Sequence, residues 1–156
     1  MRIENIADHL DLINTIALWY FQEWGHADPR GSVQSWADGL RGRINRDRIP
    51  ATYVALEGSE LLGSVTLVEH DMKSHLDISP WLAGLYVRPE QRGLGIGSAL
   101  TDHALETAAQ MGVDRLYLYT DSARDFYLKL GWRSIAQDVY EGQTVTIMSL
   151  DIPLEK

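Results

Sequence analysis

The chain has 156 residues, a length typical of one domain, and we expect a single domain over residues 1–156. Hydrophobic residues make up 45% of it and charged residues 23%, which is ordinary for a globular protein and excludes general disorder. The net charge of −8 argues against nucleic acid as a partner, and the absence of cysteine excludes disulfides, a thiol nucleophile and Cys-ligated metals.

The chain shows no sign of targeting or of internal division. Its charged start, Met1–Asn5, lacks the apolar run of a secretory signal, and no stretch approaches the ~20 apolar residues of a membrane span. No repeat or Ser/Pro-rich linker interrupts it. We therefore expect a cytoplasmic protein with no membrane partner.

Two amphipathic helices are predicted in the first third of the chain. The first carries apolar residues at steps of three and four: Ile6, Leu10, Ile13, Ala17 and Tyr20. A loop over Gly25–Gly31 follows. Ser32 can then cap a second helix, whose apolar face is Val33, Trp36, Ala37, Leu40 and Ile44.

Strand-forming runs occupy the middle of the chain. Thr52–Leu56 and Leu61–Glu69 are separated by a short loop that contains a glycine, which predicts a hairpin. The polar segment His70–Pro80 is expected to be a loop, and Trp81–Val87 has the length and composition of a third strand.

The second half alternates helices and strands. A helix after Gly97 would bury Leu100, Ala104, Ala108 and Met111, and Leu116–Thr120 follows as a strand. A capping box over Ser122–Asp125 predicts a short helix that Gly131 ends. Arg133–Tyr140 and Thr144–Leu150 close the chain as a hairpin. The predicted fold is α/β, a mixed sheet with helices on its faces, in the order ααβββαβαββ.

The stretch from Trp81 to Thr120 is predicted to be a right-handed parallel β–α–β crossover, which places a ligand at the turn after Val87. That turn contains three glycines within five residues, Gly93, Gly95 and Gly97, where one would suffice to reverse the chain. Glycines there let the backbone aim free N–H groups at a phosphate on the helix N-terminus, and the alternative is a tight turn that uses glycine for packing.

The type of phosphate site can be narrowed. A Walker loop needs Gly-Lys-Ser/Thr, which is absent. A dinucleotide site is disfavoured because Ser98 stands where a third glycine is expected, although Asp121 lies near the place of a ribose-binding acid.

Two separated motifs resemble the signatures of the GNAT acetyltransferases. The first is Arg92-x-x-Gly95-x-Gly97 after a strand that ends in Leu85-Tyr86-Val87, and it resembles the acetyl-CoA motif. The second runs from Ala123 to Trp132 and resembles the family's other signature, in which Phe usually stands in place of Trp132. The predicted element order also matches the family fold, so the resemblance covers nearly the whole chain.

The resemblance implies acetyl-CoA as the acetyl donor. The backbone of one strand would pair with the pantetheine amides, and the amides of the glycine-rich turn would hold the pyrophosphate. The two strands Trp81–Val87 and Leu116–Thr120 would splay apart around the thioester. The implied binding residues are Leu85, Tyr86, Val87, Gln91, Arg92, Gly93, Leu94, Gly95, Ile96, Gly97 and Ser98.

The resemblance also implies a catalytic residue, because Tyr127 matches the tyrosine that protonates the departing CoA thiolate. A base is useful as well, since an alkylamine with a pKa near 10.4 is almost entirely protonated at pH 7. Glu69 is the first candidate, His70 the second because of its ordinary pKa near 6.5, and Asp71 lies beside them. An exposed polar strand end explains these residues equally well.

Several features qualify the resemblance. Thr120 stands where the family often has Asn, and the strand Leu116–Thr120 lacks the Glu of the ribosomal-protein Nα-acetyltransferases.

The family's first two helices roof the acceptor site, so Tyr20, Trp24 and Trp36 are candidate substrate contacts. His70, Asp71, His75 and Asp77 could be taken for a metal cluster, but such loops are mostly solvated and the family needs no metal.

The sequence therefore favours an acetyl-CoA-dependent N-acetyltransferase that acts on a primary amine of a small cationic molecule by direct attack in a ternary complex. The alternatives are a protein or peptide N-acetyltransferase, a non-catalytic CoA-binding regulatory module and, more distantly, a dinucleotide-binding enzyme. The exposed edges of the last hairpin could pair in a homodimer.

Overall fold

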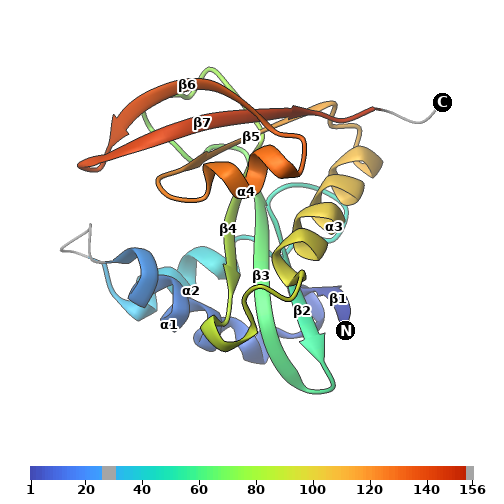
Figure 1. The fold of residues 1–156 in the computed structure, drawn as a ribbon. Helices are drawn as coiled ribbons and strands as arrows, with labels where there is room; N and C mark the ends of the chain where they lie inside the picture. Colours follow the sequence, from blue (N-terminus) through green and yellow to red (C-terminus); the bar gives the residue numbers. More distant parts are fainter. Residues whose placement is uncertain (26–30, 154–156) are drawn as a thin grey trace.

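The structure is a computed structural model that describes residues 1–25 and 31–153. Within them, seven strands form one sheet in the order β1-β2-β3-β4-β5-β7-β6 (Figure 1). Neighbouring strands are antiparallel except β4 and β5, which are parallel as predicted. The strands are β1 Arg2–Asn5, β2 Ala51–Glu57, β3 Glu60–Val68, β4 Trp81–Val87, β5 Arg115–Thr120, β6 Arg133–Tyr140 and β7 Gln143–Asp151.

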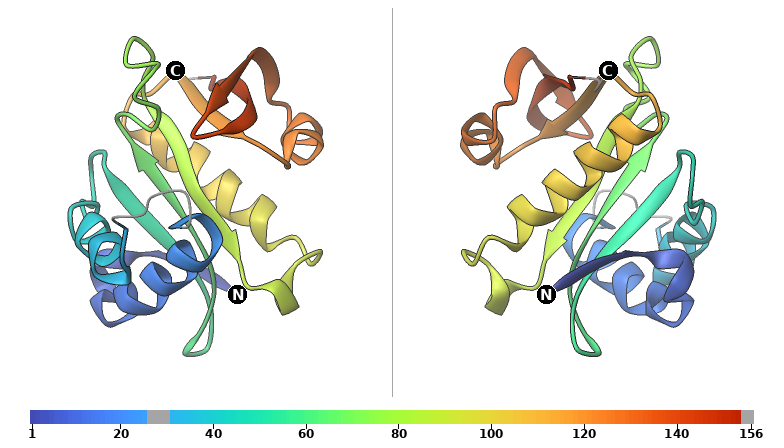
Figure 2. Two further views of the ribbon diagram at one scale, coloured as in Figure 1. Left: turned by 90° about the vertical axis from the view of Figure 1, so that its left-hand side faces the viewer. Right: turned by 90° about the vertical axis from the view of Figure 1, so that its right-hand side faces the viewer.

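The helices cover both faces of this sheet. They are α1 Ile13–Trp24, α2 Val33–Arg41, α3 Ile96–Gln110 and α4 Arg124–Lys129. Helices α1 and α2 lie on one face of the sheet and α3 on the other (Figure 2). Among the described residues, none of the helices combines the length and the apolar character needed to cross a bilayer.

Both predicted hairpins are confirmed. Strands β2 and β3 turn at Gly58, whose φ is +60°. Strands β6 and β7 turn through Glu141 and Gly142, both with positive φ, the geometry that matches the twist of a two-residue hairpin.

The N-terminal prediction is wrong in its first part. Arg2–Asn5, for which no element was predicted, forms β1, an edge strand antiparallel to β2. Two short 3₁₀ turns follow, Ile6–Asp8 and Leu10–Leu12, and α1 begins only at Ile13. The helical spacing failed because Leu10 is 52% exposed, and because Asn5 starts a turn by accepting a hydrogen bond from the Ala7 amide.

The helix caps are predicted correctly in one case and not in the other. Ser32 caps α2 in a reciprocal capping box with Ser35, although the helix ends at Arg41 and Ile44 instead bridges to Ala51. The capping box over Ser122–Asp125 is absent: Ala123 precedes α4, and its amide donates to Thr120 Oγ1 at 2.9 Å. The loop predicted over Gly25–Gly31 lies largely outside the described residues.

The buried residues fall into three clusters, and the sheet separates the first from the other two. The largest lies between the sheet and α3, where burial of each large aliphatic side chain contributes about 1.5–3 kcal/mol. The second holds α1 and α2 against β2 and β3. The third lies under the segment between β3 and β4 and contains Met72, Trp81 and Ile147.

Candidate active site

Strands β4 and β5 separate almost as soon as they meet. Among the described residues they share one pair, Trp81 with Tyr117, beside a hydrogen bond from the Tyr117 amide to the Pro80 carbonyl. Beyond it β5 pairs with β7 along its whole length. The carboxyl-terminal halves of β4 and β5 therefore diverge, and the edge of β4 that faces β5 is left without a strand partner (Figure 1).

Strand β4 bulges in front of this opening. Its register with β3 slips by one residue, since Thr66 pairs with Ala83 but Ser64 with Tyr86. The extra residue lies at Gly84, whose φ of +61° is rarely adopted by other residues.

Tyr20 of α1 holds the bulge in place. Its hydroxyl donates to the Gly84 carbonyl at 2.7 Å and lies 2.5 Å from Ser64 Oγ. Burial raises the pKa of Tyr20 to about 12, so the phenol stays protonated and remains a donor. Because Tyr20 is buried and committed to Gly84, the structure does not support it as a substrate contact.

The bulge decides which peptide groups of β4 face the opening. The Arg88 amide donates to the Leu62 carbonyl, and Tyr86 pairs with Ser64, so the peptide groups of Tyr86 and Arg88 face β3. Alternation along the strand then turns those of Leu85 and Val87 toward the open edge. Of the three residues expected to pair with pantetheine, Tyr86 is thus already engaged with β3, and the Val87 carbonyl accepts from Arg92 Nε at 2.9 Å.

The three glycines of the following turn serve two purposes. Gly93 and Gly95 have φ of +80° and +87°, and a Cβ on either would meet open space. Gly97 is helical, but its Cβ would lie 3.3 Å from the Phe126 ring of α4. Packing therefore explains Gly97, whereas Gly93 and Gly95 set the backbone of an exposed turn.

Free amide donors lie only in the second half of this turn. The first bond of α3 runs from the Ala99 amide to the Gly95 carbonyl, which leaves the amides of residues 96–98 without an acceptor inside the helix. The amides of Gln91 and Arg92 instead donate to carbonyls of Arg88 and Pro89. The helix N-terminus is thus the part suited to an anion.

The charges around the turn agree with this placement. Arg88 forms ion pairs with Glu60, at 2.7 Å, and with Glu90. A hollow of about 350 Å³ on this flank is lined in part by Glu57 and Glu60, which pair with the N-terminal ammonium and with Arg88, so the cations here are already neutralised. The Arg92 guanidinium lies over the Tyr86 ring, 5.4 Å from its centroid.

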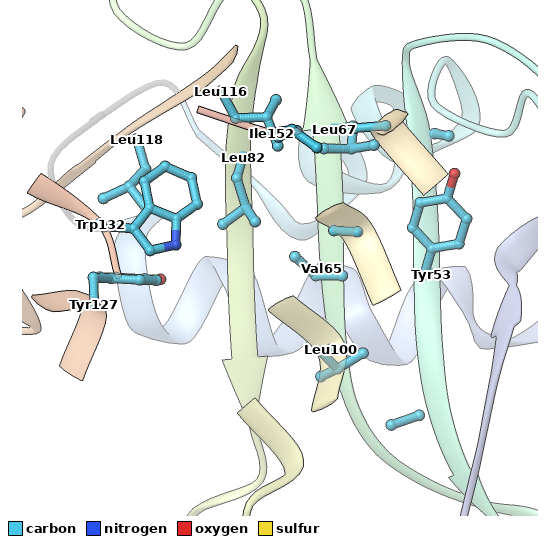
Figure 3. Close-up of a cluster of buried hydrophobic side chains, with 14 of the residues drawn as sticks. Tyr53, Val65, Leu67, Leu82, Leu100, Leu116, Leu118, Tyr127, Trp132 and Ile152 are labelled. Carbon is cyan, nitrogen blue, oxygen red and sulfur yellow. The ribbon is translucent and has the colours of Figure 1, made fainter. Parts of the chain in front are cut away.

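Tyr127, in α4, and Trp132, between α4 and β6, lie side by side. Gly131, with φ of +96°, ends α4, and the Trp132 amide returns to the Tyr127 carbonyl at 3.1 Å. The two rings meet edge-to-face with centroids 5.9 Å apart. Both side chains are buried, and the Tyr127 oxygen and the Trp132 nitrogen point to the same side, toward β4 (Figure 3).

The environment of Tyr127 is apolar. Burial alone raises the pKa of its phenol above the ordinary value near 10. The proton therefore stays on the oxygen across the physiological range, and Tyr127 is available as an acid or a hydrogen-bond donor.

The three candidate bases differ in their surroundings. Glu69 and His70 are exposed, and Ser79 Oγ donates to Glu69 at 3.3 Å. Asp71 is half-buried, and burial raises its pKa to about 6, with Glu141 raising it further and Arg43 opposing the shift. Burial raises the pKa of Tyr119 on β5, and the charge of Asp71 raises it further.

Aromatic residues gather on the side of the sheet that faces away from α3. Trp19 stacks on Tyr86 at 5.1 Å, and Trp24, which is 38% exposed, lies near the same ring. On β5, Tyr119 contacts both Trp81 and Tyr140. The residue pattern does not predict these contacts, because the rings come from four separate elements.

Thr120 and His75, two polar residues that the sequence analysis considered, have structural roles. Thr120 Oγ1 accepts from the Ala123 amide and thereby begins α4. His75 lies 2.7 Å from Asp138 and ties the segment between β3 and β4 to β6. Among the described residues, no three His, Asp or Glu side chains gather as metal ligands would.

Comparison with known proteins agrees with this architecture. The family model described as "Acetyltransferase (GNAT) family" matches residues 11–132. No curated protein matches the chain significantly.

Solved structures of low sequence identity share the fold. An aminoglycoside 6'-N-acetyltransferase complexed with coenzyme A superposes with a TM-score of 0.80 at 17% identity, over 100% of this chain and 99% of that one. The aminoglycoside 6'-N-acetyltransferase from Enterococcus faecium gives 0.76 at 18%, over 100% and 99%. The IAA acetyltransferase from Bacillus cereus gives 0.67 at 24%, over 96% and 98%.

Proposed function

This chain belongs to the GNAT acetyltransferase family, and we propose that it moves an acetyl group from acetyl-CoA to a primary amine of a small cationic molecule. Family membership makes it an N-acetyltransferase with acetyl-CoA as donor. The observation that carries the proposal is the buried Tyr127, which stays protonated and whose oxygen points toward β4. One continuous sheet supports taking residues 1–156 as a single domain.

The residues around the opening fit the donor. The amides of residues 96–98 are available to the pyrophosphate at the α3 N-terminus, with Gly93 and Gly95 leaving its approach clear. The free edge of β4 at Leu85 and Val87 can receive the pantetheine amides as an added strand. The donor contacts proposed from the sequence are kept, except that the Tyr86 backbone is paired with β3 and the Gln91 and Arg92 amides are already used within the protein.

Direct transfer needs no covalent enzyme intermediate. The amine nitrogen bonds to the acetyl carbon, the C–S bond breaks, and sulfur leaves with the electron pair. Tyr127 supplies the proton that makes the thiol, and the proton released by the amine restores the phenol. Because a thiol has a pKa near 8.5 and burial raises that of Tyr127 above 10, donation becomes complete only when it is coupled to the amine's proton.

Among the candidate bases, the surroundings favour Asp71. Glu69 and His70 are exposed, whereas Asp71 is half-buried beside the aromatic wall, and its pKa near 6 leaves it ionised at neutral pH yet more basic than an ordinary carboxylate. The charged groups that act on Asp71 are Arg43 and Glu141. Its aromatic neighbour Tyr119 is in turn surrounded by Tyr140, Glu141 and Asp121. The test is the acidic limb of the pH profile, which the Asp71→Asn variant should lose.

A small cationic acceptor agrees with the charges and the walls of the opening. The net charge of −8 attracts cations, and aromatic faces bind ammonium groups. Two structural neighbours act on aminoglycosides, which carry several amines. A peptide acceptor and a regulatory role without turnover remain the competing functions, and Tyr127 favours catalysis over regulation.

The experiment compares melting temperatures with acetyl-CoA, CoA and NAD. A ligand at 100 times its Kd stabilises by about 2.7 kcal/mol, which is several degrees for a domain of this size. Thiol release is then followed with a polyamine, an aminoglycoside, an amino-acid amide and a lysine peptide. A shift with NAD alone would overturn the donor assignment, and turnover with the peptide alone would overturn the acceptor class.

A homodimer is proposed from the free edge of the sheet. Strand β6 is the last strand in the order, and it exposes Ile135 and Val139, at 46% and 66%. Edge strands with apolar side chains pair readily with another copy. Sedimentation should give a dimer that Val139→Lys dissociates, and a monomeric wild-type protein would contradict the proposal.

A further inference from the structure

We propose that the indole N–H of Trp132 donates a hydrogen bond to the thioester end of bound acetyl-CoA, beside Tyr127. The inference rests on the proposed function and assigns a second donor to the same reacting group. It starts from a buried polar atom that lacks a partner in the protein itself.

Trp132 is 2% exposed, and its Nε1 has no hydrogen-bond partner among the described residues. A buried donor without an acceptor destabilises the folded state, and native proteins rarely keep one. The only other buried side-chain N or O atom without a partner in residues 1–25 and 31–153 is the Tyr53 hydroxyl. Each of the two therefore needs an explanation.

The two atoms differ in what they can reach. Tyr53 lies on the far side of the core, where its ring contacts His103 (Figure 3). Its hydroxyl hydrogen can rotate toward a nearby partner such as the Thr107 hydroxyl. The N–H of an indole lies in the ring plane and cannot rotate. Trp132 thus needs an acceptor at one fixed place.

The position of the Trp132 ring is set by its neighbours. Its amide is bonded to the Tyr127 carbonyl, and its ring packs at 67° against the Tyr127 ring. In Figure 3 the Trp132 nitrogen and the Tyr127 oxygen both lie on the side that faces β4. The Tyr127 oxygen lies on the same side but is not hydrogen-bonded to this nitrogen, and the nearby Leu82 and Leu118 carry no acceptor.

A thioester would supply the hydrogen-bond acceptor that the Trp132 indole N–H lacks in the protein. It presents a carbonyl oxygen and a sulfur, and the sulfur becomes a strong acceptor as the C–S bond breaks and negative charge accumulates. Tyr127 gives the proton, whereas the indole keeps its own and contributes only a hydrogen bond. Phe, which usually stands at this position in the second GNAT signature, would keep an aromatic ring but remove the donor.

The first test follows the five tryptophan indole N–H resonances by nitrogen–proton NMR, with Trp132→Phe to assign one of them. The Trp132 resonance should move downfield when the wild-type protein is titrated to saturation. Movement with both CoA and acetyl-CoA places the acceptor at sulfur, and movement with acetyl-CoA alone places it at the carbonyl oxygen. An unmoved resonance in a protein that acetyl-CoA stabilises against heat overturns the inference, whereas the absence of that stabilisation refutes the proposed function itself.

The second test is kinetic. Trp132→Phe should lower kcat about ten- to a hundredfold, the usual range for a hydrogen bond to a charged group, with KM for the amine unchanged. Tyr53→Phe is the matched control, since it removes the other unpartnered buried donor far from the opening, and its kcat should equal that of the wild type. Equal kcat in Trp132→Phe and Tyr53→Phe would refute the role. The NMR test on the wild-type protein stands even if Trp132→Phe folds poorly.

Discussion

Replacing Tyr127 with Phe tests the centre of the proposed mechanism. The change removes one oxygen and keeps the ring, which contacts Phe126 and Trp132 at centroid distances of 5.0 and 5.9 Å. The free energy of unfolding should therefore change by no more than about 1 kcal/mol. Turnover should fall by about 10²–10⁴-fold, which corresponds to about 3–5 kcal/mol in the activation barrier, because the thiolate loses its proton source.

The affinity for acetyl-CoA should stay the same, because backbone groups of β4 and the α3 N-terminus hold the donor. The assay measures kcat from thiol release at saturating amine and donor, and Kd for acetyl-CoA from calorimetry. Burial keeps the Tyr127 pKa above its ordinary value, so loss of this acid should not lower wild-type turnover between pH 8 and 10. A variant that loses donor affinity but keeps its turnover would refute the reasoning.

The remaining predictions concern Asp71, Tyr20 and Gly95. The pKa of Asp71, about 6, lies above the unfolded value near 3.9, so the folded state binds its proton more tightly and stability falls as pH rises from about 4 to 6. Asp71→Asn should thus be more stable than the wild type at pH 8, by up to about 3 kcal/mol, with no gain at pH 4, as urea midpoints will show. Tyr20→Phe should lose about 1–3 kcal/mol of stability and part of kcat, since the Gly84 carbonyl loses its donor; unchanged kcat would separate the bulge from catalysis. Gly95→Ala should lose about 1–2 kcal/mol from its φ of +87° alone, because its Cβ meets open space, and should show a smaller melting shift with acetyl-CoA.

Much of the site could be predicted because its elements are specified locally. The turn after β4 needs glycine at positions 93 and 95 for its backbone angles, and a helix always leaves its first amides free. Tyr127 was identified only through the resemblance, since its spacing alone is typical of a packed aromatic residue. The structure adds that Gln91 and Arg92 use their amides in a 3₁₀ turn, which no pattern of residue types indicates.

The choice among the candidate bases could not be made from the residue pattern. Glu69, His70 and Asp71 are consecutive and polar, and their order along the chain says nothing about burial. The chain turns inward after His70 because Met72 enters the cluster under Trp81, and Asp71 is carried partly inside with it. The difference between an exposed carboxylate and one with a pKa near 6 comes from that packing.

By itself, the amino-acid sequence determined the hairpins, the Ser32 cap, the parallel crossover and the glycine turn that opens α3. Each of these depends on hydrogen bonds or backbone angles within a few residues, or on a hydrophobic period. Only the tertiary structure decided the edge strand β1, the Gly84 bulge held by Tyr20 and the unpartnered nitrogen of Trp132. Tyr20 is 64 residues from Gly84 along the chain, and a contact over such a separation depends on how helices and strands pack rather than on local propensity.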